Sequence, residues 1–272
     1  MSDFSEFQNR YLISAVLELE KPMHIGKGTS LEPVGTDMPV IIDQQGKPVI
    51  PGSSVKGVLR SEIERILRTL GAQQKEIDGK IIRACDSSDP CLEKKERDEL
   101  VRKCTENGRL NGAKFAKEIF SRLCTACELF GSGESASHVM IKDMSLCSEK
   151  IRTELRDGVA IDRDTGTARS GALFDFEIVP VGAEFAFEAI LENVEDWQVG
   201  LFGIALKLWE RGEIAVGGKT TIGMGFGKLK RISAKMVNAD NLINHVITGE
   251  ASEVTIEDYI EIFRNKLEGQ NA

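Results

Sequence analysis

The sequence predicts an α+β fold with a ferredoxin-like, RRM-like βαββαβ core that carries a helical insertion and a projecting β-hairpin. Two observations predict it. Stretches with strand-like alternation and stretches with helical periodicity follow one another in the order strand, helix, strand, strand, helix, strand. A charged, cysteine-containing stretch at 71–135 and a turn-rich stretch at 158–180 interrupt that order, and we expect them to leave the core. RNA-recognition modules use the same order of elements.

The first predicted strand covers residues 10–20, where apolar side chains fall on both faces, as expected for a central strand. Residues 21–47 are rich in glycine, proline and polar residues and predict a long loop. Loops of this length are usually functional or disordered. Apolar residues then recur at helical spacing from 55 to 70, which predicts an amphipathic helix.

The start of this helix has the composition of an anion site. Ser53 or Ser54 is expected to cap the N-terminus. Lys56 and Arg60 lie four residues apart and are expected to share the exposed side. The positive end of the helix, the serines and the two cations would together attract an anion. The alternative is an ordinary capped helix with solvated cations.

The remaining elements follow from alternation, periodicity and turn residues. Asp196 is expected to cap the second core helix, and Gly212 to end it. In chain order, we predict a strand at 137–143, a projecting hairpin at 158–180, a strand at 183–191, a helix at 197–211, a strand at 226–237, and a helical C-terminal extension at 240–272 with an amphipathic helix at 256–267.

Composition predicts one globular domain over residues 1–272, with 41% hydrophobic and 29% charged residues. The sequence has neither an apolar run of about 18 residues nor a signal-peptide pattern, so we expect a cytoplasmic protein without a membrane partner. A net charge of −8 argues against a general nucleic-acid binder. Residues 214–239, however, hold five basic residues and no acidic one, which allows a local basic track.

A glycine-rich stretch at 216–231 interleaves five glycines with cationic residues. Glycine lets a backbone approach a ligand closely, so this composition favours a loop that holds phosphates. Gly218-Lys219-Thr220 is not a Walker A motif, because Glu213 stands where that motif needs glycine and no helix is predicted directly afterwards. A flexible hairpin connection is the alternative.

Six cysteines in a chain of this kind suggest metal binding before disulfides. Cys124-x-x-Cys127 has a common zinc-ligand spacing, and a closed tetrahedral site needs two more thiolates. Cys85 and Cys91, which bracket a short loop, are the expected partners, with Cys104 as the substitute. The zinc would be structural and would hold the insertion at 71–135 together. A redox Cys-x-x-Cys is the competing interpretation, but no thioredoxin-like context surrounds it.

Three motifs in this order resemble the RAMP superfamily of CRISPR proteins. They are the segment 51–57 that opens the first helix, the segment 124–132, and the glycine-rich loop after the second helix. Segments 35–40 and 171–177 match as well, and the resemblance extends from about residue 12 to 232. Within the superfamily, the chain is most similar to the repeated backbone subunit of type III effector complexes, which act in antiviral defence.

The resemblance implies that copies of the chain, or related RAMP subunits, stack along a CRISPR guide RNA beside other effector subunits in a ribonucleoprotein complex. It also implies that the hairpin at 158–180 is a thumb that displaces nucleotides of a complementary target RNA, with Thr165 and Thr167 near the contact. The implied RNA-binding residues are Ser53, Ser54, Lys56, Arg60, Arg169, Gly217, Gly218, Lys219, Thr220 and Gly223.

In catalytic members of the superfamily, an aspartate in the loop after the first strand cleaves target RNA with a divalent metal ion. By motif, that residue is Asp37 here, and Mg²⁺ or another divalent cation is the implied cofactor. Asp37 could instead only cap the turn at 35–39. Two further alternatives remain, an inert RNA-binding subunit and a CRISPR RNA processing endonuclease with His24 as its base.

Overall fold

The computed structural model of the chain describes residues 4–28, 36–86, 88, 90–148 and 151–269, so Gly35 of the expected 35–40 motif lies outside the described residues. Its centre is a five-stranded sheet in which every neighbouring pair of strands is antiparallel. The strands lie in the order β13 (Ser252–Val254), β12 (Gly227–Asn238), β1 (Asn9–Leu19), β11 (Glu184–Glu192) and β7 (Val139–Ile141). The predicted strand at 10–20 is therefore confirmed, and β1 is central.

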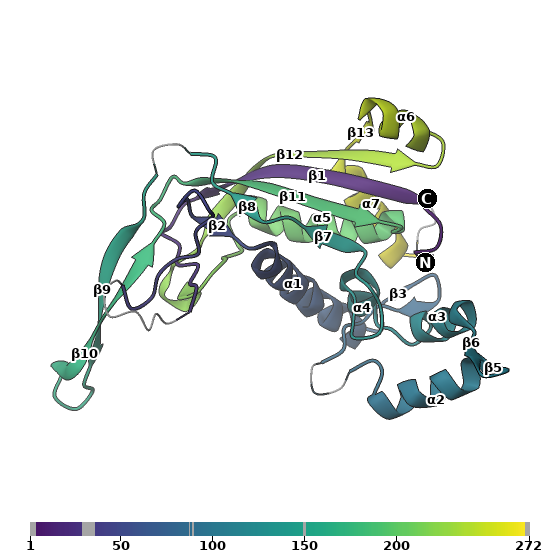
Figure 1. Cartoon of the computed structure of the whole chain (residues 1–272), viewed down its shortest axis with the longest axis horizontal. Coiled ribbons are helices and arrows are strands. Elements are labelled where there is room, and N and C mark those ends of the chain that lie inside the picture. Colours follow the sequence, from purple (N-terminus) through teal and green to yellow (C-terminus); the bar gives the residue numbers. More distant parts are fainter. Residues whose placement is uncertain (1–3, 29–35, 87, 89, 149–150, 270–272) are drawn as a thin grey trace.

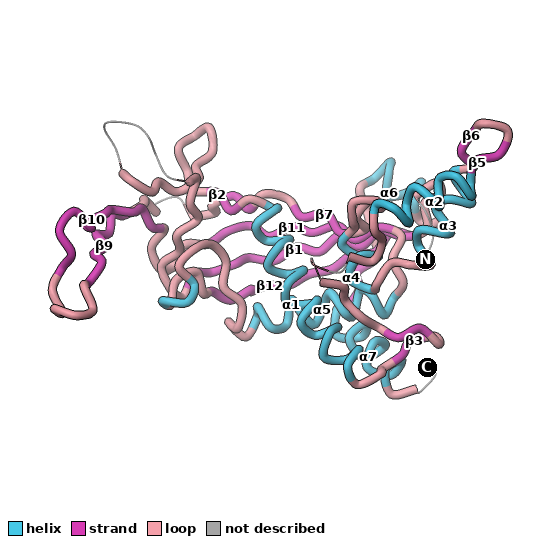
Figure 2. The backbone as a smooth tube through the Cα atoms, turned by 90° about the horizontal axis from the view of Figure 1, so that it is seen from below, coloured by secondary structure: helices cyan, strands magenta, loops and turns pink. Residues whose placement is uncertain are grey.

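Helices α1 (Gly52–Ala72), α5 (Asp196–Glu210) and α7 (Ile256–Leu267) cover one face of this sheet (Figures 1 and 2). Burial alternates along β1, and Tyr11, Ile13 and Leu17 point into the helical layer. The main core lies between the sheet and the helices, where removal of apolar surface from water stabilises the fold.

The two core helices begin differently from the sequence prediction. Pro51 is the N-cap of α1, and no side chain caps it, so the expected serine cap is wrong. Instead, the first amide of α1, from Gly52, donates to Asp143 Oδ1 at 2.8 Å. In α5, Glu195 rather than Asp196 is the cap, and it forms a capping box with Gln198.

Gly52 fixes how α1 approaches the sheet. A Cβ at this position would lie 2.2 Å from the carbonyl oxygen of Ile141 in β7. Only glycine lets the helix start so close to that strand. The sequence therefore places the N-terminal turn of α1, with Ser53 and Ser54, at a fixed point beside the sheet.

Two excursions leave the core at opposite ends of the molecule (Figure 1). One is the hairpin of β9 (Glu154–Ile161) and β10 (Ala168–Ile178), which starts at Glu154, earlier than predicted. In its turn, the Asp162 carboxylate accepts from the amides of Asp164 and Thr165 at 3.0 Å each. The other contains β3 (Glu76–Ile77), β4 (Lys80–Ile81), α2 (Lys94–Cys104), β5 (Thr105–Glu106), β6 (Arg109–Leu110), α3 (Gly112–Phe120) and α4 (Thr125–Phe130).

Four short elements complete the described part of the chain. They are β2 (Val49–Ile50), β8 (Met144–Ser145), the 3₁₀ turn η1 (Thr220–Ile222) and α6 (Leu242–Thr248). The predicted C-terminal helix is present as α7, whereas the edge strand β13 in the same extension was not predicted. None of the described helices is long and apolar enough to cross a membrane.

Candidate functional site

Three segments that are far apart in the sequence meet at a cavity of about 510 Å³. They are the chain after β1, the first turns of α1, and the glycine-rich loop after α5. Its lining residues are His24, Ile25, Gly26, Gly28, Met38, Ser54, Val58, Gly217 and Gly218. The structure thus joins two of the segments that the sequence marked as phosphate-binding. We refer to this site as the His24 cavity.

His24 connects the chain after β1 to β10 and to the glycine-rich loop. Its side chain is only 7% exposed, and its Nδ1 lies 2.7 Å from the carbonyl oxygen of Glu177, so Nδ1 carries the proton. The amide of Gly218 donates to the His24 carbonyl at 2.8 Å. A Cβ on Gly217, where φ is +97°, would lie 2.5 Å from that carbonyl oxygen. The glycine-rich loop therefore needs glycine here to lie against His24, which serves as a structural residue.

Lys219 is the cation nearest to this junction in the glycine-rich loop. Its backbone is left-handed, with φ of 61°, and its Nζ lies 4.9 Å and 4.5 Å from the ring centres of Phe174 and Phe176. Phe176 belongs to a second, smaller apolar cluster with Ile178 and Met224. This cluster connects the base of the β9–β10 hairpin with the glycine-rich loop.

The basic residues that follow along β12 are mostly paired with acidic ones. Lys228 Nζ lies 2.7 Å from Glu20, and Lys230 forms an ion pair with Glu18. Arg231 lies 3.7 Å from Glu184. The continuous basic track that the sequence allowed at 214–239 is therefore largely neutralised, because facing strands supply carboxylates.

Asp37 is exposed and is not one of the lining residues, although it directly precedes Met38, which lines the cavity. Its Oδ2 accepts a hydrogen bond from the amide of Asp175 in β10 at 3.1 Å. That bond joins residues 138 positions apart, so the Asp37 carboxylate does more than cap a local turn. An exposed carboxylate held from one side leaves its other side open to solvent and ligands.

The other expected RNA-binding residues are spread more widely. Ser54 lines the His24 cavity, whereas Ser53, one position earlier, is exposed. Lys56 is half-buried, and burial together with the charge of Arg60 lowers its pKa. Thr220 lies in η1, Gly223 is exposed at φ of +89°, and Arg169 is exposed near the hairpin tip.

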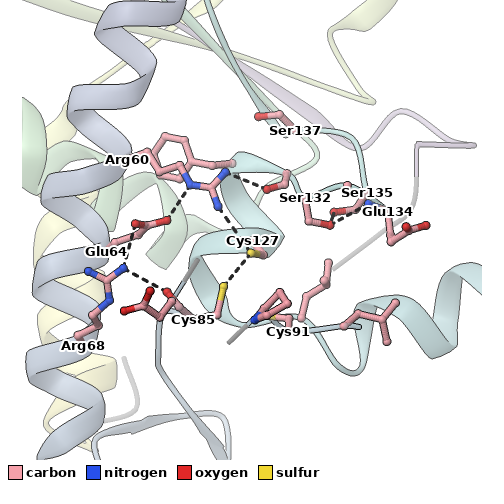
Figure 3. Close-up of a pocket in the computed structure, with 17 residues that line it drawn as sticks. Arg60, Glu64, Arg68, Cys85, Cys91, Cys127, Ser132, Glu134, Ser135 and Ser137 are labelled. Carbon is pink, nitrogen blue, oxygen red and sulfur yellow. Dashed lines mark hydrogen bonds and ion pairs between the residues drawn. The ribbon is translucent and has the colours of Figure 1, made fainter. Parts of the chain in front are cut away.

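Arg60 points away from the His24 cavity. Its guanidinium pairs with Glu64 at 2.7 Å, donates to the Gly131 carbonyl at 3.1 Å and lies 3.7 Å from Cys127 Sγ (Figure 3). It thereby lines a second cavity of about 870 Å³ next to the cysteines. Arg60 and Lys56 are both partly exposed, and the hydrogen bonds of Arg60 direct its guanidinium toward the insertion.

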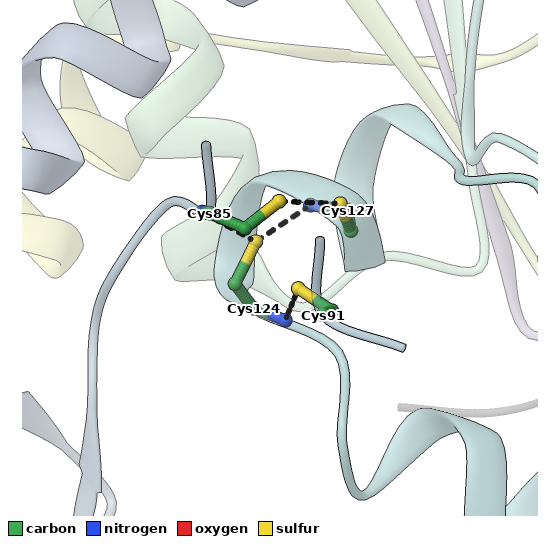
Figure 4. Close-up of side chains that lie close together, drawn as sticks. All are labelled: Cys85, Cys91, Cys124 and Cys127. Atoms are coloured by element: carbon green, nitrogen blue, oxygen red, sulfur yellow. Dashed lines mark hydrogen bonds between the residues drawn. The ribbon is translucent and has the colours of Figure 1, made fainter. Parts of the chain in front are cut away.

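The expected four cysteines come together, as Figure 4 shows. The sulfurs of Cys85, Cys91, Cys124 and Cys127 all lie within 4.8 Å of one another, and Cys85 Sγ is 3.5 Å from Cys127 Sγ. Cys104, the sequence-based substitute, is buried at the end of α2 and is not part of this group.

Backbone amides point at the sulfurs, as they do in many thiolate sites. The Cys124 amide donates to Cys91 Sγ at 3.1 Å, and the amides of Cys85 and Cys127 donate to Cys124 Sγ at 3.3 Å and 3.4 Å. A hydrogen bond from the Cys127 thiol lowers the pKa of Cys124 to about 4, whereas burial raises the pKa of Cys91 to about 12. The four cysteines can therefore be a mixture of thiolates and thiols, or they can bind a metal ion that replaces the thiol protons.

Comparison with known proteins decides the family. The family profile described as "RAMPs: RAMP superfamily" matches residues 16–229. The chain belongs to the RAMP superfamily. It is also 28% identical over 245 residues to the CRISPR system Cms endoribonuclease Csm3 of Methanocaldococcus jannaschii, and this alignment covers 85% of the chain and 82% of the relative.

The RAMP match spans β1 through the glycine-rich loop and so contains both the His24 cavity and the cysteine cluster. Sequence reasoning missed one feature of the site, because Asp175 was quoted within a motif without a role. The alternation of Asp175, Phe176 and Glu177 at the end of a predicted hairpin was the available signal, since it sends acidic side chains to one face.

Proposed function

We propose that this RAMP protein is a guide-RNA-binding backbone subunit of a type III CRISPR effector complex, and that it cleaves complementary target RNA. The observation that carries the proposal is the His24 cavity, where the chain after β1, the start of α1 and the glycine-rich loop converge. The similarity to a protein named as a CRISPR system endoribonuclease supports it. We further propose a ferredoxin-like core, and the strand order β12-β1-β11-β7 with α1 and α5 on one face supports this assignment.

In this proposal, the His24 cavity holds guide phosphates. Loop amides other than that of Gly218, which donates to His24, the Ser54 hydroxyl and the cation of Lys219 are the groups that would contact them. The overall charge of −8 does not oppose this, because contacts made by backbone amides require no excess of basic side chains. Copies of the chain or related subunits would continue the guide-binding surface in the cytoplasm, and the tip of the β9–β10 hairpin, with Thr165, Thr167 and Arg169, would contact guide and target as the thumb.

Asp37 is the proposed catalytic residue. Mg²⁺ commonly binds through one or two carboxylates together with substrate phosphate oxygens, and an exposed aspartate fits this donor set. When bound, a divalent ion would stabilise negative charge on the scissile phosphate. The protein's part is to hold the Asp37 carboxylate in place beside the base of the thumb, with Oδ2 fixed by the Asp175 amide.

The cysteine cluster is the proposed structural zinc site. Zinc–sulfur bonds of about 2.3 Å in a tetrahedron place the sulfurs about 3.8 Å apart. The four sulfurs here lie within 4.8 Å of one another, so small side-chain adjustments suffice. The ligands come from both ends of the insertion, so the ion would hold α4 against the loop at 85–91.

The test is cleavage of a guide-complementary RNA by the reconstituted complex with wild-type, Asp37→Ala or Asp43→Ala subunits, each with Mg²⁺ or with EDTA. Asp43 is a matched control because it is a partly exposed aspartate of the same loop whose carboxylate accepts from the amides of Gln45 and Lys47. We expect cleavage to be lost in Asp37→Ala and in EDTA and kept in Asp43→Ala. Unchanged cleavage by an assembled Asp37→Ala complex would leave only the inert guide-binding role.

A further inference from the structure

The segment that carries Asp37 lies along the base of the thumb. Met38 forms a parallel bridge with Phe176 of β10, and the Glu177 amide donates to the Met38 carbonyl at 3.0 Å. The Val40 amide donates to the carboxylate of Glu177 at 2.9 Å. Residues 36–40 are thus attached to β10 by backbone and side-chain bonds.

Asp175 makes the closest connection to Asp37. Its Oδ1 accepts from the Asp37 amide at 2.6 Å and from the Thr36 hydroxyl at 2.8 Å. In return, the Asp175 amide donates to Asp37 Oδ2 at 3.1 Å. The backbone and the carboxylate of Asp37 are therefore both fixed by one residue of β10.

Asp175 stays ionised in this arrangement. The bond from the Asp37 amide, and then that from the Thr36 hydroxyl, lower the pKa of its carboxyl below the ordinary value of about 3.9. A lowered pKa means that the carboxylate acceptor is present throughout the neutral range. It is lost only when the pH falls through that lowered value.

We propose that Asp175 is the positioning residue for Asp37, and that it sets where the cleaving carboxylate stands relative to the thumb. The proposal rests on the proposed function, because it assigns Asp37 to cleavage. Asp175 holds Asp37 to β10, the returning strand of the thumb, so a nucleotide displaced by the thumb and the carboxylate that acts beside it share one rigid support. Asp175 acts on Asp37 through the hydrogen bonds that its Oδ1 accepts, and it does not bind the metal ion.

Two variants of Asp175 separate the loss of its hydrogen-bond acceptor from the loss of its negative charge. Asp175→Asn keeps a carbonyl oxygen that can accept from Thr36 and Asp37, whereas Asp175→Ala removes it. Asp157 is the register partner of Asp175 on β9 and is exposed, so Asp157→Ala is the matched control for loss of a carboxylate at this level of the hairpin. Thr36→Val removes one donor and leaves Asp175 itself intact.

The first measurement is the single-turnover cleavage rate of assembled complexes over a range of Mg²⁺ concentrations. We expect Asp175→Ala to slow cleavage about 10- to 100-fold, the effect of misplacing a catalytic group by about 1 Å, with guide content and Mg²⁺ dependence unchanged. Asp175→Asn and Asp157→Ala are expected to stay within about threefold of wild type. A wild-type rate in Asp175→Ala overturns the proposal. If Asp175→Asn cleaves as slowly as Asp175→Ala, the proposal is also overturned, whether or not the variant needs more Mg²⁺.

The second measurement is hydrogen–deuterium exchange of the peptide 36–43 in the full chain, which does not depend on cleavage. We expect faster exchange in Asp175→Ala and near-wild-type exchange in Asp175→Asn; unchanged exchange in Asp175→Ala contradicts the positioning role. If Asp175→Ala fails to assemble, Thr36→Val is expected to cleave more slowly than wild type, and an unchanged rate overturns the proposal. Cleavage that persists in Asp37→Ala would refute the proposed function, while the exchange result would still report whether Asp175 holds the loop.

Discussion

Removal of the proposed zinc from the cysteine cluster should open the insertion while the sheet stays folded. Cys85 and Cys124 lie 39 residues apart, and a bound ion closes this loop as a cross-link would. The entropy of closing a loop of that length in the unfolded chain corresponds to about 4 kcal/mol at 25 °C. We therefore expect Cys124→Ser, or removal of the metal by a chelator, to destabilise the insertion by about 4 kcal/mol.

Elemental analysis and hydrogen–deuterium exchange measure this effect. We expect one zinc per wild-type chain, and faster exchange over 85–135 but not in β1 or β11 once the metal is removed. Cys147→Ser is the matched control, because Cys147 is exposed and stands outside the cluster. A folded wild-type protein without metal, or exchange that a chelator leaves unchanged, would refute the reasoning.

Two further predictions each compare a pair of variants. Lys219→Ala should weaken guide RNA binding and lower the slope of log affinity against log salt concentration by about one in a filter-binding titration. Lys228→Ala should leave this slope unchanged, because the Lys228 cation pairs with Glu20. Equal slopes in both variants would contradict the assignment of Lys219. Gly52→Ala should lower the free energy of unfolding by about 1–3 kcal/mol in chemical denaturation, because its Cβ would lie 2.2 Å from the Ile141 carbonyl oxygen. Gly57→Ala should not lower it, because a Cβ at position 57 has open space around it. An unchanged free energy of unfolding in Gly52→Ala would show that α1 can shift away from β7.

Local patterns in the sequence predicted most of the core. Strand alternation and helical periodicity report which face of an element is buried, and β1, α1 and α7 appear where those patterns placed them. Caps were less predictable, because the amide of Gly52 is satisfied by Asp143, 91 residues away. The edge strand β13 was missed because three residues carry too little periodicity to be recognised.

The candidate site, like the core, could be predicted only in part from the sequence. The four cysteines were chosen from their spacing, and the structure brings them together. The orientation of Arg60 and the pairing of Lys228 with Glu20 did not follow, because both depend on which elements pack against each other. The bonds between Asp37 and Asp175 join residues 138 positions apart, and the alternation around Asp175 does not indicate which distant segment that residue contacts.

The most direct test of guide binding at the His24 cavity is cross-linking in the assembled complex. A guide RNA carrying 4-thiouridine is irradiated, and the attached peptides are identified by mass spectrometry. The account predicts attachment within 21–28, 52–58 and 216–223, the segments that meet at the cavity. Attachment instead to the opposite face of the sheet, around Leu12, Ser14 and Lys235, would contradict it and place the RNA on the strands.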